Sequence, residues 1–392
     1  MHPKKVYELI ECLLANPDSA PALYLWGPPG VGKSATPRGV TQKHHIGFCD
    51  NRAPLHDPTD YRGIPTVIGD NAVWLPPAEL PTPNFCMRCQ MVLHPRTMEI
   101  TGTRVEQPDG KVNGVICKRC GSSDIVWKGI LVLEELSSAP PMTQASCYQL
   151  TLDKMIGDYQ LPRGWIILAT SNRLEDRAVV HRTSTALLNR FIHVDYEICV
   201  DDWVEWALTD GHIEPDIVGF IKWRGKPLLF NFNPESSERA FATPRSWEFA
   251  SKIMGLIKSK EILLETLTGC VGNAATMEFF AFLKIQKELP NLTDILSGKS
   301  RYVPDFNRID LIYAIISALV ANADPKQHFD NLIKYSFNLP REFSVLLITM
   351  MLSRDRAQLQ VAPSFPKWAE TQKNVILPRN DQRKDTRNVQ RI

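Results

Sequence analysis

The sequence lacks any long apolar run. The longest, Ile309 to Val320, is too short to cross a bilayer and carries Asp310 and Ser317. The opening segment, Met1 to Ala15, is a mixed polar helix pattern without the apolar centre of a secretory signal. We therefore expect a cytoplasmic protein that does not insert into a membrane.

The sequence also has little net charge and few cysteines. The formal net charge is only +2, so no global field would draw the chain onto nucleic acid or an anionic membrane. Nine cysteines in 392 residues are too few for a disulfide scaffold, and four of them form two C-x-x-C pairs, which favours metal binding in a reducing compartment. The composition is otherwise that of a globular protein, and the length predicts more than one domain.

Alternating strand and helix patterns predict the fold class. Apolar runs at 22–26, 130–133 and 165–169 are typical of buried strands, and Gln144 to Ile156 has apolar residues at helical spacing. This alternation indicates a three-layer α/β core with a parallel sheet. After Pro234 the strand signals fade and helical spacing takes over, so a smaller helical domain is expected to follow the core.

These shifts in composition predict the domain boundaries. Prolines at 76, 77, 81 and 83 mark the edge of an insertion that contains the cysteine pairs. The last residues are polar and basic, which is typical of a flexible tail. The predicted parts are a core over 1–232, an insertion in it over 84–124, a helical domain over 233–300, a helical extension over 301–377 and a flexible basic tail over 378–392.

A phosphate-binding loop follows the first predicted strand. Its residues match G-x-x-x-x-G-K-[ST] in full, and a helix is expected from Lys33. The glycines let backbone amides face a β-phosphate, Lys33 brings a positive charge to the β and γ oxygens, and Ser34 offers its hydroxyl to Mg²⁺. Pro37 lies near the first helical turn, where its missing N–H costs little. The predicted ATP-binding residues are Gly27, Pro28, Pro29, Gly30, Val31, Gly32, Lys33 and Ser34.

Two acidic residues follow another buried strand. P-loop NTPases need a carboxylate at a strand end to hold the Mg²⁺ shell and a group that positions water. Glu134 and Glu135 come directly after Leu131–Leu133. We assign Glu134 to the metal shell and Glu135 to polarising the attacking water. The alternative is that both are part of a solvated helix start.

Three further polar residues are candidates for the same site. Asn172 closes the strand at 165–169 and is expected to sense the γ-phosphate or orient water, unless it only caps a turn. Arg190 suits stabilisation of a transferring phosphoryl group across a subunit interface, with a structural salt bridge as the alternative. Arg245 follows Thr243 and Pro244, which predict a helix start. From there it could reach the nucleotide, and the alternative is an exposed first-turn arginine.

The order of these motifs resembles the MoxR-like branch of AAA+ ATPases. The matching segments are 27–34 (Walker A), 131–135 (Walker B), 169–172 (sensor 1), 187–191 (arginine finger) and 243–247 (sensor 2), with shorter likenesses at 57–65, 157–162 and 172–177. The hundred C-terminal residues are unmatched. The family usually has Asp at the place of Glu134. The longer side chain moves the carboxylate towards the Mg²⁺ water shell, so nucleotide binding is better supported than turnover.

The resemblance implies an assembly and a type of partner. It implies a homo-oligomeric ring, expected to be a hexamer, with ATP between subunits and Arg190 reaching into the neighbour's site. It also implies a chaperone-like remodeller of a client protein, such as one with a von Willebrand type A domain or a metal centre. A hairpin expected at 66–75 lies where such proteins carry a pore-facing insertion. This makes Val67, Ile68 and Trp74 candidate contact residues, unless the hairpin packs in the core.

The cysteine pairs predict a structural zinc site. Two C-x-x-C knuckles present four thiolates, which complete a tetrahedral Zn²⁺ site and leave no open catalytic position. A redox dithiol is the alternative. Because the insertion looks too small to bury a core, the metal would supply most of its folding free energy. The predicted zinc ligands are Cys86, Cys89, Cys117 and Cys120.

Two alternative functions stay open. A nucleic-acid motor or loader would use the zinc ribbon to grip DNA or RNA, and a nucleotide-dependent assembly scaffold would scarcely hydrolyse ATP. Basic residues in the insertion would serve phosphate contacts, although protein contact is favoured over nucleic acid. These residues are Arg88, Arg96, Arg104, Lys111, Lys118 and Arg119.

Overall fold

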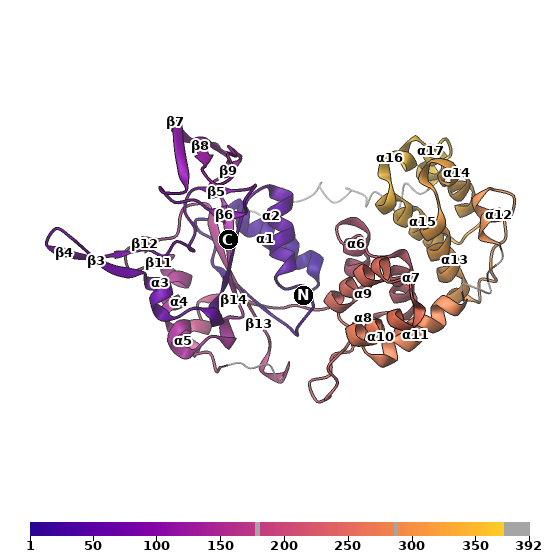
Figure 1. The fold of residues 1–392 in the computed structure, drawn as a ribbon, viewed down its shortest axis with the longest axis horizontal. Coiled ribbons are helices and arrows are strands. Elements are labelled where there is room, and N and C mark those ends of the chain that lie inside the picture. The colour runs from indigo at the N-terminus through magenta and orange to yellow at the C-terminus, as the bar shows by residue number, and fades with distance from the viewer. Residues whose placement is uncertain (177–180, 286–288, 290, 372–392) are drawn as a thin grey trace, which may run out of the picture. The chain divides into compact units, whose positions relative to one another are not determined.

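The chain divides into two compact units (Figure 1). The computed structural model describes residues 1–176, 181–285, 289 and 291–371. The first unit comprises Met1–Cys199, Phe232–Ser237 and Thr243–Arg245, and the second comprises Val200–Asn231, Glu238–Ala242 and Ser246–Ile392. The long continuous segment of the first unit ends at Cys199, and two short later segments return to it. The domain bounds expected from the sequence, with the core over 1–232, stay a prediction. The predicted tail over 378–392 and Arg177 lie outside the described residues.

A parallel sheet of five strands forms the centre of the first unit. Its strands β10 and β13 are buried along their whole length, as expected for a sheet covered on both faces. All four pairings are parallel, which confirms the predicted α/β fold class. In spatial order the strands are β14 (Phe191–Asp195), β1 (Ala22–Trp26), β13 (Trp165–Ser171), β10 (Gly129–Glu134) and β2 (Gly47–Arg52).

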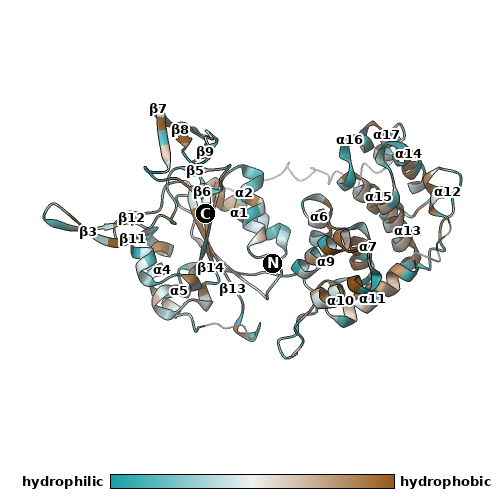
Figure 2. Cartoon of the chain, in the orientation of Figure 1, coloured by the Kyte–Doolittle hydropathy of each residue, from teal (hydrophilic) through white to brown (hydrophobic). Residues whose placement is uncertain are grey.

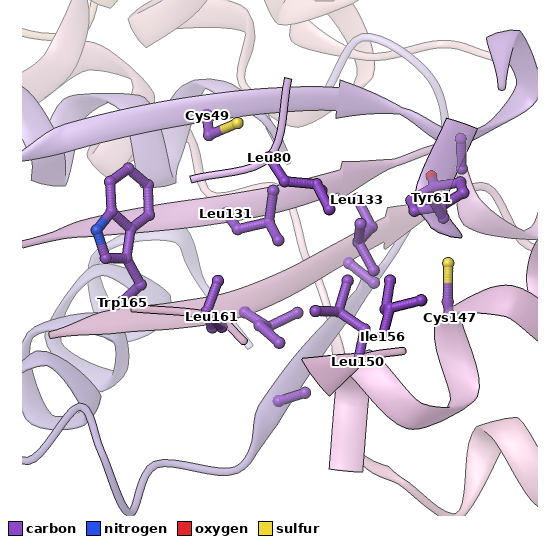
Figure 3. Packing of buried hydrophobic residues seen from close by; sticks show 14 of the residues in the cluster. Cys49, Tyr61, Leu80, Leu131, Leu133, Cys147, Leu150, Ile156, Leu161 and Trp165 are labelled. Atoms are coloured by element: carbon purple, nitrogen blue, oxygen red, sulfur yellow. The ribbon is translucent and has the colours of Figure 1, made fainter. Parts of the chain in front are cut away.

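Helices cover both faces of this sheet. On one face, Leu131 and Leu133 pack with Cys147 and Leu150 of α4 (Pro141–Asp153), as Figure 3 shows. Because strand residues alternate between faces, Ile130 and Val132 point to the other side, and they are fully buried. There α1 (Pro3–Ala15) and α2 (Ala35–His44) contact the strands, which completes the predicted three layers.

The helix after the phosphate loop begins two residues later than predicted. Its first residue is Ala35 rather than Lys33, so Pro37 is its third residue. The first N–H groups of a helix have no partner within it, so a proline there removes no hydrogen bond. Pro37 therefore continues the helix, as the sequence predicts.

Short elements connect these strands on the way to the site. They are the 3-10 turns Ala53–Leu55, Leu136–Ser138 and Leu174–Asp176, the helices α3 (Pro58–Arg62) and α5 (Thr185–Leu188), and the pair β11 (Met155–Ile156) and β12 (Tyr159–Gln160).

The predicted hairpin at 66–75 is present and extends from the body of the first unit (Figure 1). It consists of β3 (Ile64–Ile68) and β4 (Asn71–Leu75), joined by a turn in which Gly69 has φ of 63°. The side chains of Ile64 and Val67 are 73% and 76% exposed. A core-packed hairpin, the alternative interpretation, is therefore wrong.

The insertion has a small apolar core of its own. The strands β5 (Phe85–Cys86), β6 (Met91–Val92) and β9 (Ile125–Val126) form one sheet, and β7 (Met98–Glu106) pairs with β8 (Val112–Cys117). The expectation that the insertion is too small to bury a core is wrong, because Val112 and Val115 of β8 are buried in one cluster with knuckle cysteines. The buried cluster contains Cys86, Leu93, Val112, Val115, Cys117 and Ile125.

The insertion is anchored to the amino-terminal ends of the sheet strands. Phe85 meets Trp165 edge-on, with ring centroids 6.2 Å apart. Gly47 and Gly129 leave room for the Trp165 ring, because a Cβ atom would lie 2.9 Å from it at Gly47 and 2.6 Å from it at Gly129. The cysteine ribbon and the phosphate loop thus lie at opposite ends of the strands.

The second unit is helical, as predicted after the core. Its helices carry both apolar and polar positions (Figure 2), which is typical of helices that bury one side. None of the described helices is both long and apolar enough to span a membrane. The helices are α6 (Val200–Thr209), α7 (Pro215–Arg224), α8 (Lys226–Leu229), α9 (Pro244–Leu256), α10 (Lys260–Val271), α11 (Asn273–Ile285), α12 (Leu292–Leu296), α13 (Ile309–Asn322), α14 (Pro325–Ser336), α15 (Arg341–Arg354), α16 (Arg356–Val361) and α17 (Phe365–Thr371).

A helix from the end of the predicted core, α7, packs directly on α13 of the predicted extension. A Cβ atom on Gly219 of α7 would lie 1.8 Å from Ser317 Oγ of α13, so the two helix backbones approach closely at this glycine. The described residues from Ser246 onward, which include most of the predicted lid and the predicted extension, belong to one compact unit together with α7.

Candidate functional site

The phosphate loop connects β1 to α2 and has the backbone that its glycines permit. Gly30 and Gly32 have φ of 76° and 103°, values that residues with a Cβ rarely adopt. At Gly27 a Cβ atom would lie 3.1 Å from the carbonyl oxygen of Tyr196, which leaves little room for a side chain. Local backbone geometry or close packing thus explains each of the three glycines in the loop.

Lys33 points back onto the loop. Its Nζ donates to the carbonyl oxygens of Gly27 and Pro28 at 2.6 and 2.8 Å, and to Asn172 Oδ1 at 2.9 Å. Burial lowers the pKa of Lys33 to about 8, although the charges of Asp176 and Glu134 oppose this shift. The ammonium is therefore held at the loop by neutral acceptors, which phosphate oxygens can replace.

Asn172 is brought to the same place from β13. Because the carboxyl-terminal ends of parallel strands meet at one edge of the sheet, the end of β13 lies beside the loop that follows β1. The hydrogen bond from Lys33 joins the two predicted site residues directly. Its role in sensing phosphate stays a prediction.

Ser34 and Glu134 form the oxygen pair expected for Mg²⁺. Ser34 Oγ donates to Glu134 Oε2 at 2.7 Å, and Glu134 is 8% exposed at the end of β10. Hydroxyl and carboxylate oxygens are the ligands that Mg²⁺ prefers, so this donor set fits the ion. Thr170 Oγ1 also donates to Glu134 Oε2, at 2.5 Å. Thr170 lies within the segment 169–172 that resembles sensor 1, two residues before Asn172, but the sequence did not single it out as a site residue.

Glu135 is exposed, unlike Glu134. Its backbone is left-handed, with φ of 54° and ψ of 38°, which is uncommon for a residue with a side chain. The turn this creates ends the strand and starts the 3-10 turn at Leu136. A solvated helix start, the alternative interpretation, does not describe the buried Glu134. The role of Glu135 in polarising water stays a prediction.

Arg190 is not among the groups that meet at the phosphate loop. Its guanidinium lies 5.1 Å from the ring centroid of Tyr148 and donates to the carbonyl oxygen of Ala186. Both contacts are to an aromatic ring and a backbone carbonyl, so neither is the salt bridge of the alternative interpretation.

The start of α9 does lie on the phosphate loop. The backbone N–H of Arg245 donates to the carbonyl oxygen of Gly30 at 3.2 Å. The Thr243 side chain covers the same glycine, since a Cβ atom there would lie 2.8 Å from Thr243 Oγ1. The Arg245 charge also helps to lower the pKa of Lys33. Arg245 is itself exposed.

Four cysteines come together in the insertion with the spacing of a metal site. Their sulfur atoms all lie within 4.8 Å of one another. The Sγ atoms of Cys86 and Cys120 are 3.7 Å apart, and those of Cys89 and Cys117 are 3.9 Å apart. A tetrahedral Zn²⁺ with Zn–S bonds of about 2.3 Å sets sulfur atoms about 3.8 Å apart, so the cluster fits this ion. All four cysteines are free, as a zinc site requires.

The chain has only weak similarity to known proteins. No family model matches the chain, and no curated protein matches it. Among solved structures, the chain is similar to a mutant of RuvB from Thermotoga maritima, with 12% identity, 85% of this chain and 87% of that chain covered, and a TM-score of 0.36. It is also similar to NtrX from Brucella abortus, with 14% identity, 87% and 64% covered, and a TM-score of 0.30. At these scores the site geometry alone carries the functional argument.

The assembled edge of the sheet has the chemistry of a phosphate and magnesium site. A buried lysine, a hydroxyl paired with a carboxylate, and an amide converge from the phosphate loop, β10 and β13. An exposed glutamate follows the buried one directly. Such a set can bind a phosphate chain, hold a divalent cation and orient water.

Proposed function

We propose that the chain binds and hydrolyses ATP as an AAA+ protein of MoxR type. The observation that carries this proposal is the convergence of Lys33, Ser34, Glu134 and Asn172 at one edge of the parallel sheet. Lys33 would neutralise the β and γ oxygens, and Ser34 with Glu134 would hold Mg²⁺, which supplies further charge neutralisation when bound. Glu135 would accept a proton from the attacking water.

The hydrogen bond between Ser34 and Glu134 is relevant to the rate of ATP hydrolysis. At 2.7 Å the two groups are directly hydrogen-bonded, and this bond has to open when an ion takes its place. We therefore propose that hydrolysis is slow, in keeping with a glutamate where the resembled family usually has aspartate.

A homo-oligomeric ring, expected to be a hexamer, follows from the same proposal. Arg190 contacts Tyr148 and Ala186 rather than the phosphate loop of its own chain, which suits a role at a neighbour's nucleotide. In the hairpin, the exposed Ile64 and Val67 suit contact with a client protein. A client with a von Willebrand type A domain is proposed from the family resemblance alone.

Two variants test the ATPase proposal. Lys33→Ala should lower ATP affinity by at least about 100-fold in calorimetry, because the charge that faces the phosphates is lost. Glu135→Gln should bind ATP like the unaltered protein and hydrolyse it about 10²-fold more slowly, because an amide cannot accept the proton. Lys43→Ala is the matched control, since Lys43 lies on α2 and pairs with Glu11 at 2.9 Å.

Each part of the proposal has its own contradicting outcome. Hydrolysis by Glu135→Gln at the unaltered rate would remove Glu135 from the role of base. If the zinc-loaded protein binds no ATP with Mg²⁺ present, the ATPase proposal itself is wrong.

A further inference from the structure

The Thr170 hydroxyl lies between the two acidic residues of the site. Thr170 is on β13 and is only 1% exposed. Its Oγ1 donates to Glu134 Oε2 at 2.5 Å and accepts the backbone N–H of Glu135 at 3.3 Å. Because a threonine hydroxyl has one proton and two lone pairs, it can make both hydrogen bonds at once. A carboxylate only accepts, so the hydroxyl proton is committed to Glu134.

Glu134 is thereby held from two directions. Ser34, after the phosphate loop, and Thr170, on the neighbouring strand, both donate to the same oxygen, Oε2. The other oxygen, Oε1, accepts no hydrogen bond from a described residue. Glutamate has one more rotatable bond than aspartate, so more conformational freedom has to be restricted to hold its carboxylate in one position. The Thr170 hydroxyl supplies this restriction, since it orients the carboxylate against Ser34.

The same hydroxyl also holds the turn that carries Glu135. The left-handed backbone of Glu135 directs its N–H to Thr170 Oγ1. The next residue of β13, Ser171, accepts the N–H of Ser137 at 2.9 Å. Two adjacent hydroxyls of β13 thus fix the exit of β10, and the position of Glu135 depends on them.

We propose that Thr170 is a positioning residue that aligns Glu134 with Ser34 and Glu135 with the attacking water, and so sets the Mg²⁺ requirement of the site. This inference rests on the proposed ATPase function. Thr170 acts through the two glutamates and would itself touch neither nucleotide nor metal. It also explains how a glutamate can serve where the resembled family usually has aspartate.

The test compares three variants of buried threonines. Thr170→Val keeps the shape and removes the hydroxyl, and Thr170→Ser keeps the hydroxyl. Thr151→Val is the matched control, because Thr151 is buried on α4 and its hydroxyl donates to the carbonyl oxygen of Cys147 at 2.9 Å. The measurements are ATP affinity with and without Mg²⁺ by calorimetry, the Mg²⁺ concentration for half-maximal hydrolysis, kcat, and the midpoint of thermal unfolding.

Loss of the Thr170 hydroxyl should weaken Mg²⁺ binding rather than ATP binding itself. Changes to residues that orient metal ligands cost roughly 10- to 100-fold in metal affinity or activity, so Thr170→Val should raise the Mg²⁺ requirement and lower kcat by at least about tenfold. ATP affinity in the presence of a chelator should change by less than about twofold. Thr170→Ser and Thr151→Val should both stay within about threefold of the unaltered protein.

Several outcomes would overturn the inference. An active Thr170→Val protein with an unaltered Mg²⁺ requirement would do so, and so would a Thr170→Ser protein that loses as much as Thr170→Val, since packing of the methyl group would then explain the loss. If Thr170→Val is unfolded at the assay temperature, Thr170→Ala takes its place. Failure of the unaltered protein to bind ATP with Mg²⁺ would contradict the ATPase function itself, before any variant is compared.

Discussion

At the scale of the residue, the protein surroundings strongly affect the charge of Lys33. Burial favours its neutral form and lowers its pKa from 10.5 to about 8. Since the folded pKa lies below the unfolded one, folding is opposed by protonation of Lys33, and this contribution to instability fades as the pH rises from about 8 to 10.5. Folding favours the neutral form of Lys33, whereas phosphate binding favours its charged form.

ATP affinity should therefore fall above pH 8. Once free Lys33 is mostly neutral, binding ATP requires uptake of a proton, and the dissociation constant should rise up to about tenfold per pH unit. Calorimetry between pH 7 and pH 9.5 measures this directly. Lys33→Arg provides the control, because a guanidinium stays charged over this range. A decline in the unaltered protein no steeper than in Lys33→Arg would contradict the assignment of Lys33 as the titrating group.

Residue chemistry explains which parts of the site could be predicted. Lys33, Ser34 and Glu134 lie in short motifs whose residue types and order follow from binding a phosphate chain, and the structure brings them together. Thr170 could not be predicted in this way. Its contact with Glu134 depends on the register of β10 against β13, where Leu133 pairs with Ala169, and local spacing does not contain that register.

At the scale of the element, the cysteine insertion combines a candidate zinc site with apolar contacts to the core of the first unit. Its apolar cluster is small, and two of its members, Cys86 and Cys117, are also zinc ligands in the proposed site. Outside that cluster, Phe85 connects the insertion to Trp165 in the core. Removal of zinc should thus loosen the insertion while the sheet stays folded.

Hydrogen exchange can detect this local loosening. Zinc removal, or Cys117→Ser, should increase backbone exchange over residues 84–126 and lower the midpoint of thermal unfolding. ATP affinity should change by less than about threefold, because the insertion packs at the amino-terminal ends of the strands and the phosphate loop lies at the other ends. Cys12→Ser is the control, since Cys12 is exposed and outside the cluster. Unchanged exchange over 84–126 in metal-free protein would contradict a structural role for zinc.

The limits of prediction at this scale have a common cause. Strands and helices of the core follow local apolar spacing, so the α/β class could be inferred. The start of α2 at Ala35 depends on how the phosphate loop closes. The core of the insertion gathers residues far apart in the chain, such as Leu93 and Val112, into one buried cluster. The packing of Gly219, in the predicted core, against Ser317, in the predicted extension, is also a long-range contact.

At the scale of the whole molecule, the proposed ring depends on residues that do not complete a site within one chain. Lys33, Ser34, Glu134 and Asn172 gather at one place, whereas Arg190 is held by Tyr148 and Ala186. An arginine that stabilises the transferring phosphoryl group from a neighbouring subunit is worth roughly 10³-fold or more in turnover. Arg190→Ala should therefore bind ATP normally, keep its oligomeric state in light scattering and lose about 10³-fold in kcat.

Mixing two inactive variants separates action across the interface from action within one chain. A Lys33→Ala subunit cannot bind ATP but still presents Arg190, and an Arg190→Ala subunit binds ATP but presents no arginine. If Arg190 acts on the neighbour, equal mixing should restore hydrolysis to about a quarter of the unaltered rate, because about a quarter of the interfaces in a closed ring then have both parts. Arg38→Ala, which removes a surface arginine paired with Asp50, is the control. If the mixed rings show no rescue, Arg190 does not act on the nucleotide of a neighbouring subunit. Catalysis would then give no support for the proposed ring.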